Sequence, residues 1–250
     1  LKPIRKFPLQ RNDDKRGCVE IWVKPQKNDE GVVPRNVYIA GIDVVDKDKS
    51  TTDSLPSIFI MNRLTRQLVA EYTGRTSEAK DFYEICRKLL LYYNAVGMYE
   101  KNLIGLFNYF DRHKCTYLLA DTPYQLRSSD TYKQTGNTSK GINASATVNS
   151  EGRNMVKSWL QETISIKSET KIYETIYSPA LLTELVMWNP QGNFDRVSAL
   201  IMLMWLDSTM YKQTENRIEE VKTFLDNDYF SQMGVLKKKP TGTIDSNFYS

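Results

Sequence analysis

The chain has 250 residues, of which 40% are hydrophobic and 26% are charged, a composition typical of a soluble globular protein with a substantial core. Its formal net charge of +4 permits a polyanionic partner without demonstrating one. Three widely separated cysteines and a single histidine, His113, argue against a disulfide framework, a zinc site and a Ser/His/Asp triad. The longest strongly apolar run, residues 199–206, is too short to span a bilayer.

The first third of the chain predicts a lead-in followed by a meander of strands. Residues 1–36 are charged and contain Pro, and one strand is expected within them, in "CVEIWVKP". This lead-in would either add an edge strand to the sheet or dock on the main body. "VYIAGIDVV" then predicts a buried strand, and residues 57–65 and 67–75 predict two more with a tight turn between them. Together these three strands indicate an antiparallel meander.

Helices and strands alternate in the next part of the chain. Residues 77–94 and 102–114 place apolar side chains on one helical face and predict amphipathic helices. Residues 96–102 and 116–123 predict short strands that follow them in turn. This alternation favours right-handed crossovers onto a central sheet, so we predict a mixed α/β fold with helices flanking the sheet.

The second half of the chain predicts helices and one long loop. Residues 124–154 are rich in Ser, Thr, Asn and Gly, which is typical of a flexible loop. Residues 155–164 predict a helix, and residues 181–190 could form a helix or a strand. Residues 193–210 are apolar nearly all round, so they predict a buried helix.

These patterns divide the chain into three parts. Residues 1–36 form the N-terminal lead-in, and residues 37–210 form the main domain with its flexible loop. Residues 211–250 are polar, which predicts a C-terminal tail that is partly disordered.

Three carboxylates stand at the ends of predicted elements. Asp43 interrupts the buried strand "YIAGIDVV", Glu100 follows the apolar part of "VGMYEKN", and Asp195 begins the buried helix. If the three converge, their mutual repulsion calls for cations, and oxygen-only ligands suit Mg²⁺ or Mn²⁺. Two such ions would stabilise the attacking and leaving oxygens during cleavage of a phosphodiester.

Each acid also has a simpler interpretation. Asp43 could pair with a Lys or Arg, Glu100 could be a first-turn helix acid, and Asp195 could be an N-cap. Taken singly, the simpler interpretation is as good as metal binding for Asp43 and better for the other two. Only the ordered set of three favours metal ligation.

This ordered set resembles the RNase H-like nuclease domain of tailed-bacteriophage terminase large subunits. The similarity runs from about Tyr38 to Asp207, and it includes "EYTGR" after the third strand and "YLLADTP" before the loop. The resemblance implies an RNase H-like mixed central sheet flanked by helices.

By the same resemblance, the domain would be a two-metal-ion endonuclease that cuts double-stranded viral DNA during genome packaging. Asp43, Glu100 and Asp195 match the family's metal-binding acids, which would hold two Mg²⁺ or Mn²⁺ ions. Many relatives have two adjacent acids in the last motif, but Phe194 precedes Asp195 here. The candidates for a fourth ligand are Asp46 and Asp121.

The resemblance also implies partners. The family's packaging ATPase would lie upstream of residue 1, because no GxxxxGK[ST] phosphate loop occurs in this sequence. Further partners would be double-stranded DNA, the portal and the small terminase subunit, in the host cell cytoplasm and away from any membrane.

Basic residues in and beside the predicted loop are candidates for contacts to DNA phosphates. They are Arg127, Lys133, Lys140, Arg153 and Lys157. Two other functions remain open for the same fold. One is a nuclease of the Holliday-junction resolvase or transposase type, and the other is a DNA-binding domain without catalysis.

Overall fold

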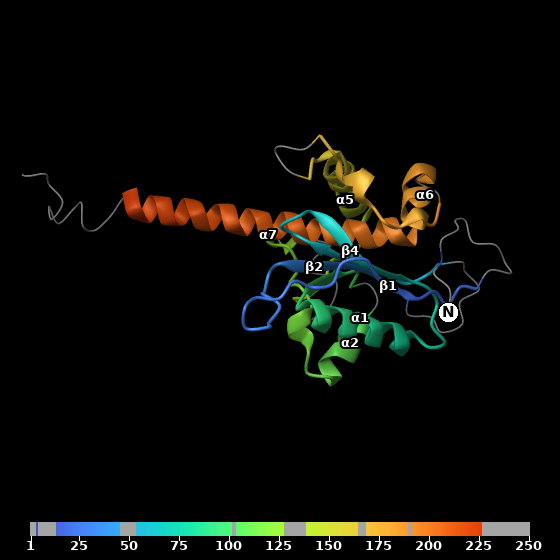
Figure 1. The fold of residues 1–250 in the computed structure, drawn as a ribbon. Coiled ribbons are helices and arrows are strands. Elements are labelled where there is room, and N and C mark those ends of the chain that lie inside the picture. The colour runs from blue at the N-terminus through green and yellow to red at the C-terminus, as the bar shows by residue number, and fades with distance from the viewer. Residues whose placement is uncertain are drawn as a thin grey trace, which may run out of the picture. The chain divides into compact units, whose positions relative to one another are not determined.

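The computed structural model shows how the chain folds (Figure 1). The residues that it describes are 4, 14–45, 54–101, 104–127, 139–164, 169–189 and 192–226, with the side chains of the last helix described as far as Tyr211. The chain divides into two compact units, Leu1–Thr209 and Met210–Ser250, and the sheet belongs to the first. Within the described ranges, no helix combines the length and the apolar character needed to cross a membrane.

A five-stranded mixed sheet forms the centre of the first unit. Its strands are β1 (Val19–Ile21), β2 (Tyr38–Asp43), β3 (Ser57–Asn62), β4 (Gln67–Thr73) and β5 (Val96–Tyr99). In space they lie in the order β1-β4-β3-β2-β5. All neighbours are antiparallel except β2 and β5, which are parallel because helix α1 (Ala79–Tyr93) returns the chain before β5 begins.

This sheet confirms several expectations from the sequence. The antiparallel meander is β2-β3-β4, the lead-in contributes the edge strand β1, and the fold is mixed α/β. A meander followed by a crossover helix and a parallel fourth strand is the arrangement expected for an RNase H-like sheet. The predicted limits of the three parts of the chain stay predictions.

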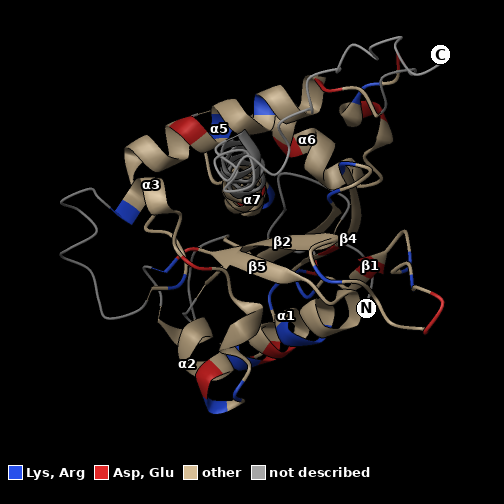
Figure 2. Ribbon diagram, turned by 90° about the vertical axis from the view of Figure 1, so that its left-hand side faces the viewer, with Lys and Arg blue, Asp and Glu red and all other residues tan. Residues whose placement is uncertain are grey.

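Helices cover both faces of the sheet (Figure 2). On one side lie α1 and α2 (Gly105–Arg112), and on the other lie α5 (Ala146–Gln161), α6 (Pro179–Met187) and α7 (Asp195–Asp226). Three short helical turns complete the described elements: η1 (Thr116–Leu118), α3 (Tyr124–Arg127) and η2 (Ile172–Thr175).

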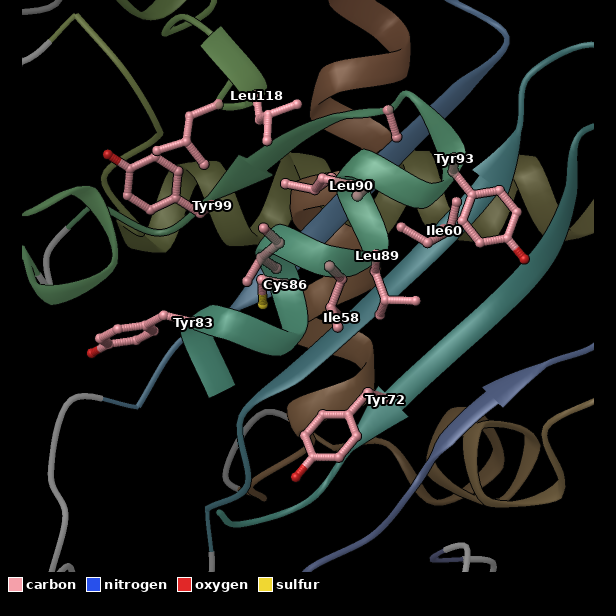
Figure 3. Packing of buried hydrophobic residues seen from close by; sticks show 14 of the residues in the cluster. Ile58, Ile60, Tyr72, Tyr83, Cys86, Leu89, Leu90, Tyr93, Tyr99 and Leu118 are labelled. Carbon is pink, nitrogen blue, oxygen red and sulfur yellow. The ribbon is translucent and has the colours of Figure 1, made fainter. Parts of the chain in front are cut away.

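Strand alternation sorts the side chains of β2 between these two layers. Ala40 and Ile42 belong to the hydrophobic core beneath α1, where Leu89 of α1 lies beside Ile58 and Ile60 of β3 (Figure 3). Because successive strand residues point to opposite faces, Gly41 and Asp43 lie on the α7 face. The carboxylate of "YIAGIDVV" is therefore directed away from this core.

Residues 116–123 are not the strand that the sequence predicts. They begin with the turn η1, and then only single bridges form, from Leu119 to Gly97 of β5 and from Asp121 to Lys140. Pro123 has no N–H with which to extend a ladder, so the pairing stops after these residues.

The predicted loop at residues 124–154 is shorter than expected. Residues 124–127 form α3, residues 128–138 lie outside the described residues, and residues 146–154 belong to α5. Ser145 starts α5 as an N-cap, since its hydroxyl accepts the amide hydrogen of Val148 at 3.2 Å.

Two other helices also differ from their predicted limits. Residues 181–190, which the sequence left open between helix and strand, contain most of α6. The buried helix predicted at 193–210 is α7, and its backbone stays helical to Asp226, beyond the start of the predicted polar tail.

Gly41 determines how closely α7 approaches the sheet. A Cβ added at Gly41 would lie 2.1 Å from the carbonyl oxygen of Ala199 and 2.4 Å from the amide nitrogen of Leu203. Both atoms are helix backbone and cannot rotate away. Gly41 therefore allows α7 to lie directly on β2.

We expect Gly41→Ala to lower the free energy of unfolding by about 3 kcal/mol or more, because the helix backbone must move to make room. Gly97→Ala is the matched control on β5, where the added Cβ would meet methyl groups of Ile42 and Leu90 at 3.0 and 3.3 Å. These methyls can shift, so the control should lose less than about 1 kcal/mol. Urea unfolding measures both, and equal losses would contradict the close seating of α7.

Candidate active site

Asp43 and Glu100 lie side by side at the carboxyl ends of two parallel strands. Ile42 of β2 is the register partner of Tyr99 of β5; Asp43 is the last residue of β2, and Glu100 is the first residue after β5. Neighbouring strands are about 4.8 Å apart, and residues in equal register point to the same face. Both carboxylates therefore belong to the α7 face, at the same edge of the sheet.

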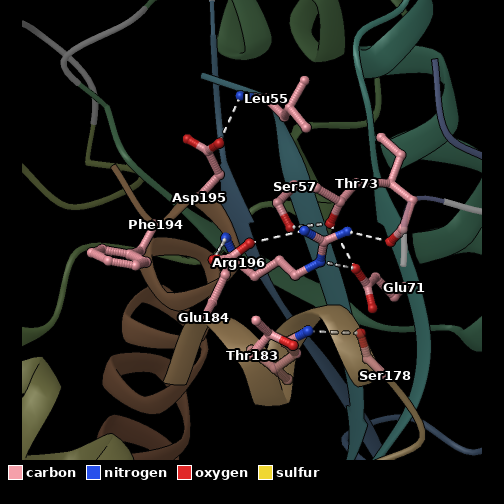
Figure 4. A network of polar contacts seen from close by, with 12 residues as sticks. Leu55, Ser57, Glu71, Thr73, Ser178, Thr183, Glu184, Phe194, Asp195 and Arg196 are labelled. Atoms are coloured by element: carbon pink, nitrogen blue, oxygen red, sulfur yellow. Dashed lines mark hydrogen bonds and ion pairs between the residues drawn. The ribbon is translucent and has the colours of Figure 1, made fainter. Parts of the chain in front are cut away.

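Asp195 reaches this edge from the other layer. It is the first residue of α7, about one turn before Ala199, which lies over Gly41. Its Oδ2 accepts the amide hydrogen of Leu55 at 2.8 Å (Figure 4). Leu55 stands two residues before Ser57, the register partner of Asp43, so α7 begins beside the end of β2.

The side chain of Asp195 is held firmly. It is 6% exposed, and besides the Leu55 amide hydrogen its Oδ2 accepts a hydrogen bond from the side-chain Nδ2 of Asn193 at 3.4 Å. The described bonds of the carboxylate thus go to a loop before β3 and to the residue two positions earlier. This is a tertiary role, which the N-cap interpretation does not include.

The three acids share one electrostatic environment. Burial raises the pKa of the Asp43 carboxyl well above its usual value, and the charges of Asp195, Glu100 and Glu184 raise it further. Burial also raises the pKa of Asp195 to about 6, although the Leu55 amide opposes this. Asp195 and Glu100 therefore act on Asp43 as nearby like charges.

The simpler interpretation of Asp43 as one half of an ion pair has no support in the described part of the chain. There, no Lys or Arg forms a salt bridge with Asp43. Its described charged neighbours are the carboxylates that raise its pKa. A divalent cation is the kind of partner that this set of oxygens would accept.

The acids do not form a ready-made metal cluster. Among the described residues, no three side chains of His, Cys, Asp or Glu lie close enough together to hold one ion. A metal site at this edge therefore needs the carboxylates to approach one another from the positions described here.

A buried basic residue beside the acids escaped the sequence analysis. Arg196 follows Asp195, and its side chain is 2% exposed between Glu71 of β4 and Glu184 of α6. The signal was present in the sequence, because an Arg in the apolar helix and Glu residues in the apolar runs "QLVAEYT" and "PALLTELVM" require partners when buried.

The other candidate residues either have partners of their own or lie outside the described residues. Asp46 and Lys133 fall outside the described residues. Asp121 is exposed, and its carboxylate pairs with Lys140 Nζ at 2.9 Å. Lys140 also donates to the carbonyl of Leu119, so both residues support the chain beside β5.

The remaining basic candidates lie on α3 and α5. Arg127 donates to the carbonyl of Thr122 at 2.8 Å. The guanidinium of Arg153 lies 4.9 Å from the ring centre of Trp188, and Lys157 is exposed. Arg127 is exposed as well, so Arg127 and Lys157 are both accessible to a phosphate, and Lys157 has its charge free of the bond that Arg127 makes to Thr122.

A cavity of about 340 Å³ lies elsewhere on the sheet. Its lining is Arg35, Asn36, Asn94, Ala95, Val96, Tyr117 and Leu118. These residues include the segments that precede β2 and β5, so the cavity is at the opposite ends of these strands from Asp43 and Glu100. It is not part of the candidate site.

Known proteins resemble this chain in structure and not in sequence. No family model matches the sequence, and no curated protein matches it. The crystal structure of the large terminase nuclease from thermophilic phage G20c is similar, over 76% of this chain and 88% of that chain. The TM-score is 0.45 and the identity is 11%. A similarity of this extent carries no conclusion about activity, and family membership stays a prediction.

The raised pKa of Asp195 should make the free energy of unfolding depend on pH. Because this carboxyl titrates near 6 in the folded protein and near 4 when unfolded, the unfolded state loses its proton first as pH rises. The parent should therefore lose stability between about pH 4 and pH 6. Asp195→Asn removes the charge, so in EDTA its gain over the parent should grow from near zero at pH 4 to about 2 kcal/mol at pH 7.

Urea unfolding across this pH range measures the gain. Asp111→Asn, which changes an exposed acid on α2, is the control and should show no such growth. A clear loss of stability in Asp195→Asn at pH 7 would mean that the Asp195 charge supports the fold.

Proposed function

We propose that this chain is a metal-dependent endonuclease that cleaves double-stranded DNA. The observation that carries the proposal is that Asp43, Glu100 and Asp195 stand at one sheet edge, where the charges of Asp195 and Glu100 raise the pKa of the Asp43 carboxyl. Such an arrangement is costly for the fold, and perturbed acids of this kind cluster at functional sites. A phage terminase nuclease is the family in which we place it.

The donor chemistry of the edge fits Mg²⁺ or Mn²⁺. All three groups offer carboxylate oxygens, the ligands that hard divalent cations prefer. When bound, two such ions would activate a water and stabilise negative charge on the phosphate. Asp43, Glu100 and Asp195 would hold them.

The protein itself would hold the three carboxylates in fixed positions. The adjacent parallel strands β2 and β5 would fix the backbones of Asp43 and Glu100 at their carboxyl ends. The Leu55 amide holds one oxygen of Asp195 and leaves the other available. Functional groups on strands and helices are held more precisely than groups on loops, which suits in-line displacement at phosphorus.

The DNA would be held through its backbone. A net charge of +4 and the accessible Lys157 on α5 suit contacts to phosphates, which carry little sequence information. We propose weak sequence preference for this reason. An ATPase domain, the portal and the small terminase subunit would be its packaging partners.

The same geometry serves a resolvase- or transposase-type nuclease equally well. A plasmid and a four-way junction offered as competing substrates separate these functions, because a packaging nuclease has no reason to prefer the junction. A DNA-binding domain without catalysis would bind both and cut neither.

We expect the chain to nick supercoiled plasmid in Mn²⁺ or Mg²⁺ without ATP, and EDTA to stop the reaction. Asp43→Asn, Glu100→Gln and Asp195→Asn should each lower the rate by about a hundredfold or more, because each removes a charged metal ligand. Gel assays of nicking measure these rates.

Asp111→Asn is again the control and should keep the parent's rate. Cleavage that persists in EDTA would contradict the metal-dependent reaction. Parent-like rates in all three acid variants would place catalysis elsewhere in the protein.

We also expect Lys157→Ala to weaken DNA binding for all sequences and to reduce the slope of log K against log salt by about 1. Lys88→Ala is the control, because Lys88 is 70% exposed but lies on α1, across the sheet. Fluorescence anisotropy at several salt concentrations measures both slopes. Equal slopes for the two variants would rule out α5 as a DNA contact.

A further inference from the structure

A buried cation lies directly beside the candidate acids. The guanidinium of Arg196 donates from Nε to Oε1 of Glu71 at 2.6 Å and from Nη1 to Oε1 of Glu184 at 2.8 Å. Its Nη2 donates to the carbonyl oxygen of Ile4 at 2.9 Å. One side chain in the first turn of α7 thus joins β4, α6 and the N-terminal segment (Figure 4).

Glu184 holds the backbone of this turn as well as the side chain. Its Oε2 accepts the amide hydrogen of Arg196 at 3.0 Å. The first amides of a helix have no partner within the helix, so a carboxylate from α6 here completes the start of α7. Both oxygens of Glu184 are engaged with Arg196, which makes Glu184 a support for α7 and not a further metal ligand.

Glu71 carries the network into the sheet. Its Oε1 accepts the hydroxyl hydrogen of Thr73 at 2.8 Å, and the oxygens of Thr73 and Ser57 are 2.8 Å apart. Ser57 is the register partner of Asp43. A continuous buried path of polar contacts therefore joins α6 and the first turn of α7 to the strand residue opposite Asp43.

Stability alone does not account for this network. Burying a guanidinium with two carboxylates costs desolvation energy, and apolar residues of similar volume often serve the fold equally well. The second oxygen, Oε2 of Glu71, is buried without a hydrogen-bond partner. What the planar guanidinium does supply is a fixed geometry, because its donors are rigid and point to three separate elements.

We propose that Arg196 is a positioning residue for Asp195. By fixing the first turn of α7 to α6 and β4, it keeps the Asp195 carboxylate on the Leu55 amide and at the edge shared with Asp43 and Glu100. The consequence for metal binding rests on the proposed nuclease function, whereas the orientation of Asp195 does not depend on it.

The first test reads the orientation of Asp195 in the metal-free protein. The Leu55 amide donates to Asp195, so its hydrogen exchange, divided by that of the Ile60 amide in β3, reports this contact apart from global stability. Arg196→Lys keeps the positive charge but replaces the planar guanidinium, with its several fixed N–H donors, by a single ammonium group. It should speed exchange at Leu55 about tenfold relative to Ile60, the effect expected when a hydrogen bond to a charged group is lost.

Arg66→Lys is the matched control. Arg66 pairs with Glu162 and with Asp207, which lies on α7 three turns beyond Asp195, so it holds the same helix at a distance from the acids. In Arg66→Lys, the ratio of the Leu55 to the Ile60 exchange rate should equal the ratio in the parent. Equal changes in the two variants, or no change in Arg196→Lys, would overturn the proposal.

Glu71→Gln, with Glu162→Gln as its control, covers the case in which Arg196→Lys does not fold. It keeps the shape of the side chain and removes one charge from the network. A faster exchange at Leu55 in Glu71→Gln alone supports the proposal. An unchanged ratio there overturns it.

The second test measures the affinity for Mn²⁺ by calorimetry. Arg196→Lys should bind Mn²⁺ about tenfold more weakly than the parent, the effect typical of a lost support for a metal ligand, and Arg66→Lys should bind as the parent does. Parent-like affinity in Arg196→Lys would overturn the metal-binding part of the proposal. If the parent itself binds no Mn²⁺, the nuclease function fails, and the exchange ratio still decides whether Arg196 orients Asp195.

Discussion

The direct contact of a helix backbone with a strand backbone determines the rest of this site. α7 lies on β2 where Gly41 has no side chain, and this contact sets where the helix begins. One turn before the contact is Asp195, and two residues beyond Gly41 on the strand is Asp43. A larger residue at position 41 would lift the helix and separate the acids, although neither acid touches Gly41. Packing density thus governs an electrostatic arrangement.

The charges at this edge destabilise the folded state. Burial raises the pKa values of Asp43 and Asp195, and neighbouring carboxylates raise the pKa of Asp43 further, so ionising the two groups at neutral pH costs stability. Beside them, one guanidinium faces two carboxylates, from Glu71 and Glu184. Folds tolerate such costs mainly where function needs them, and a bound divalent cation would turn the repulsion into attraction.

The sequence predicted the sheet better than the segments around it. Strand alternation and strong apolar runs located β2 to β5, because burial on both faces leaves a clear pattern. Residues 146–154 were assigned to a loop from their polar composition, yet they belong to α5, where Gly152 packs against Ile201 of α7. The order of the three acids along the chain suggested that they meet. The network of Arg196 could not be assigned in the same way, because its partners are 125 and 12 residues away and only the tertiary fold brings them together.

Two groups of ion pairs hold α7 on the sheet, and together they explain how an acid at a helix end can be placed accurately. Arg196 fixes the first turn, and Asp207 pairs with Arg63 and Arg66 at the other end of the meander. Arg196 and Asp207 are about 16 Å apart along the helix axis, with Gly41 beneath the helix between them. Ends are the part of a helix most prone to fraying. Glu184 completes the first turn and Arg196 ties it to β4, so two tertiary contacts restrain the helix end that carries Asp195, as a ligand for a catalytic ion would require.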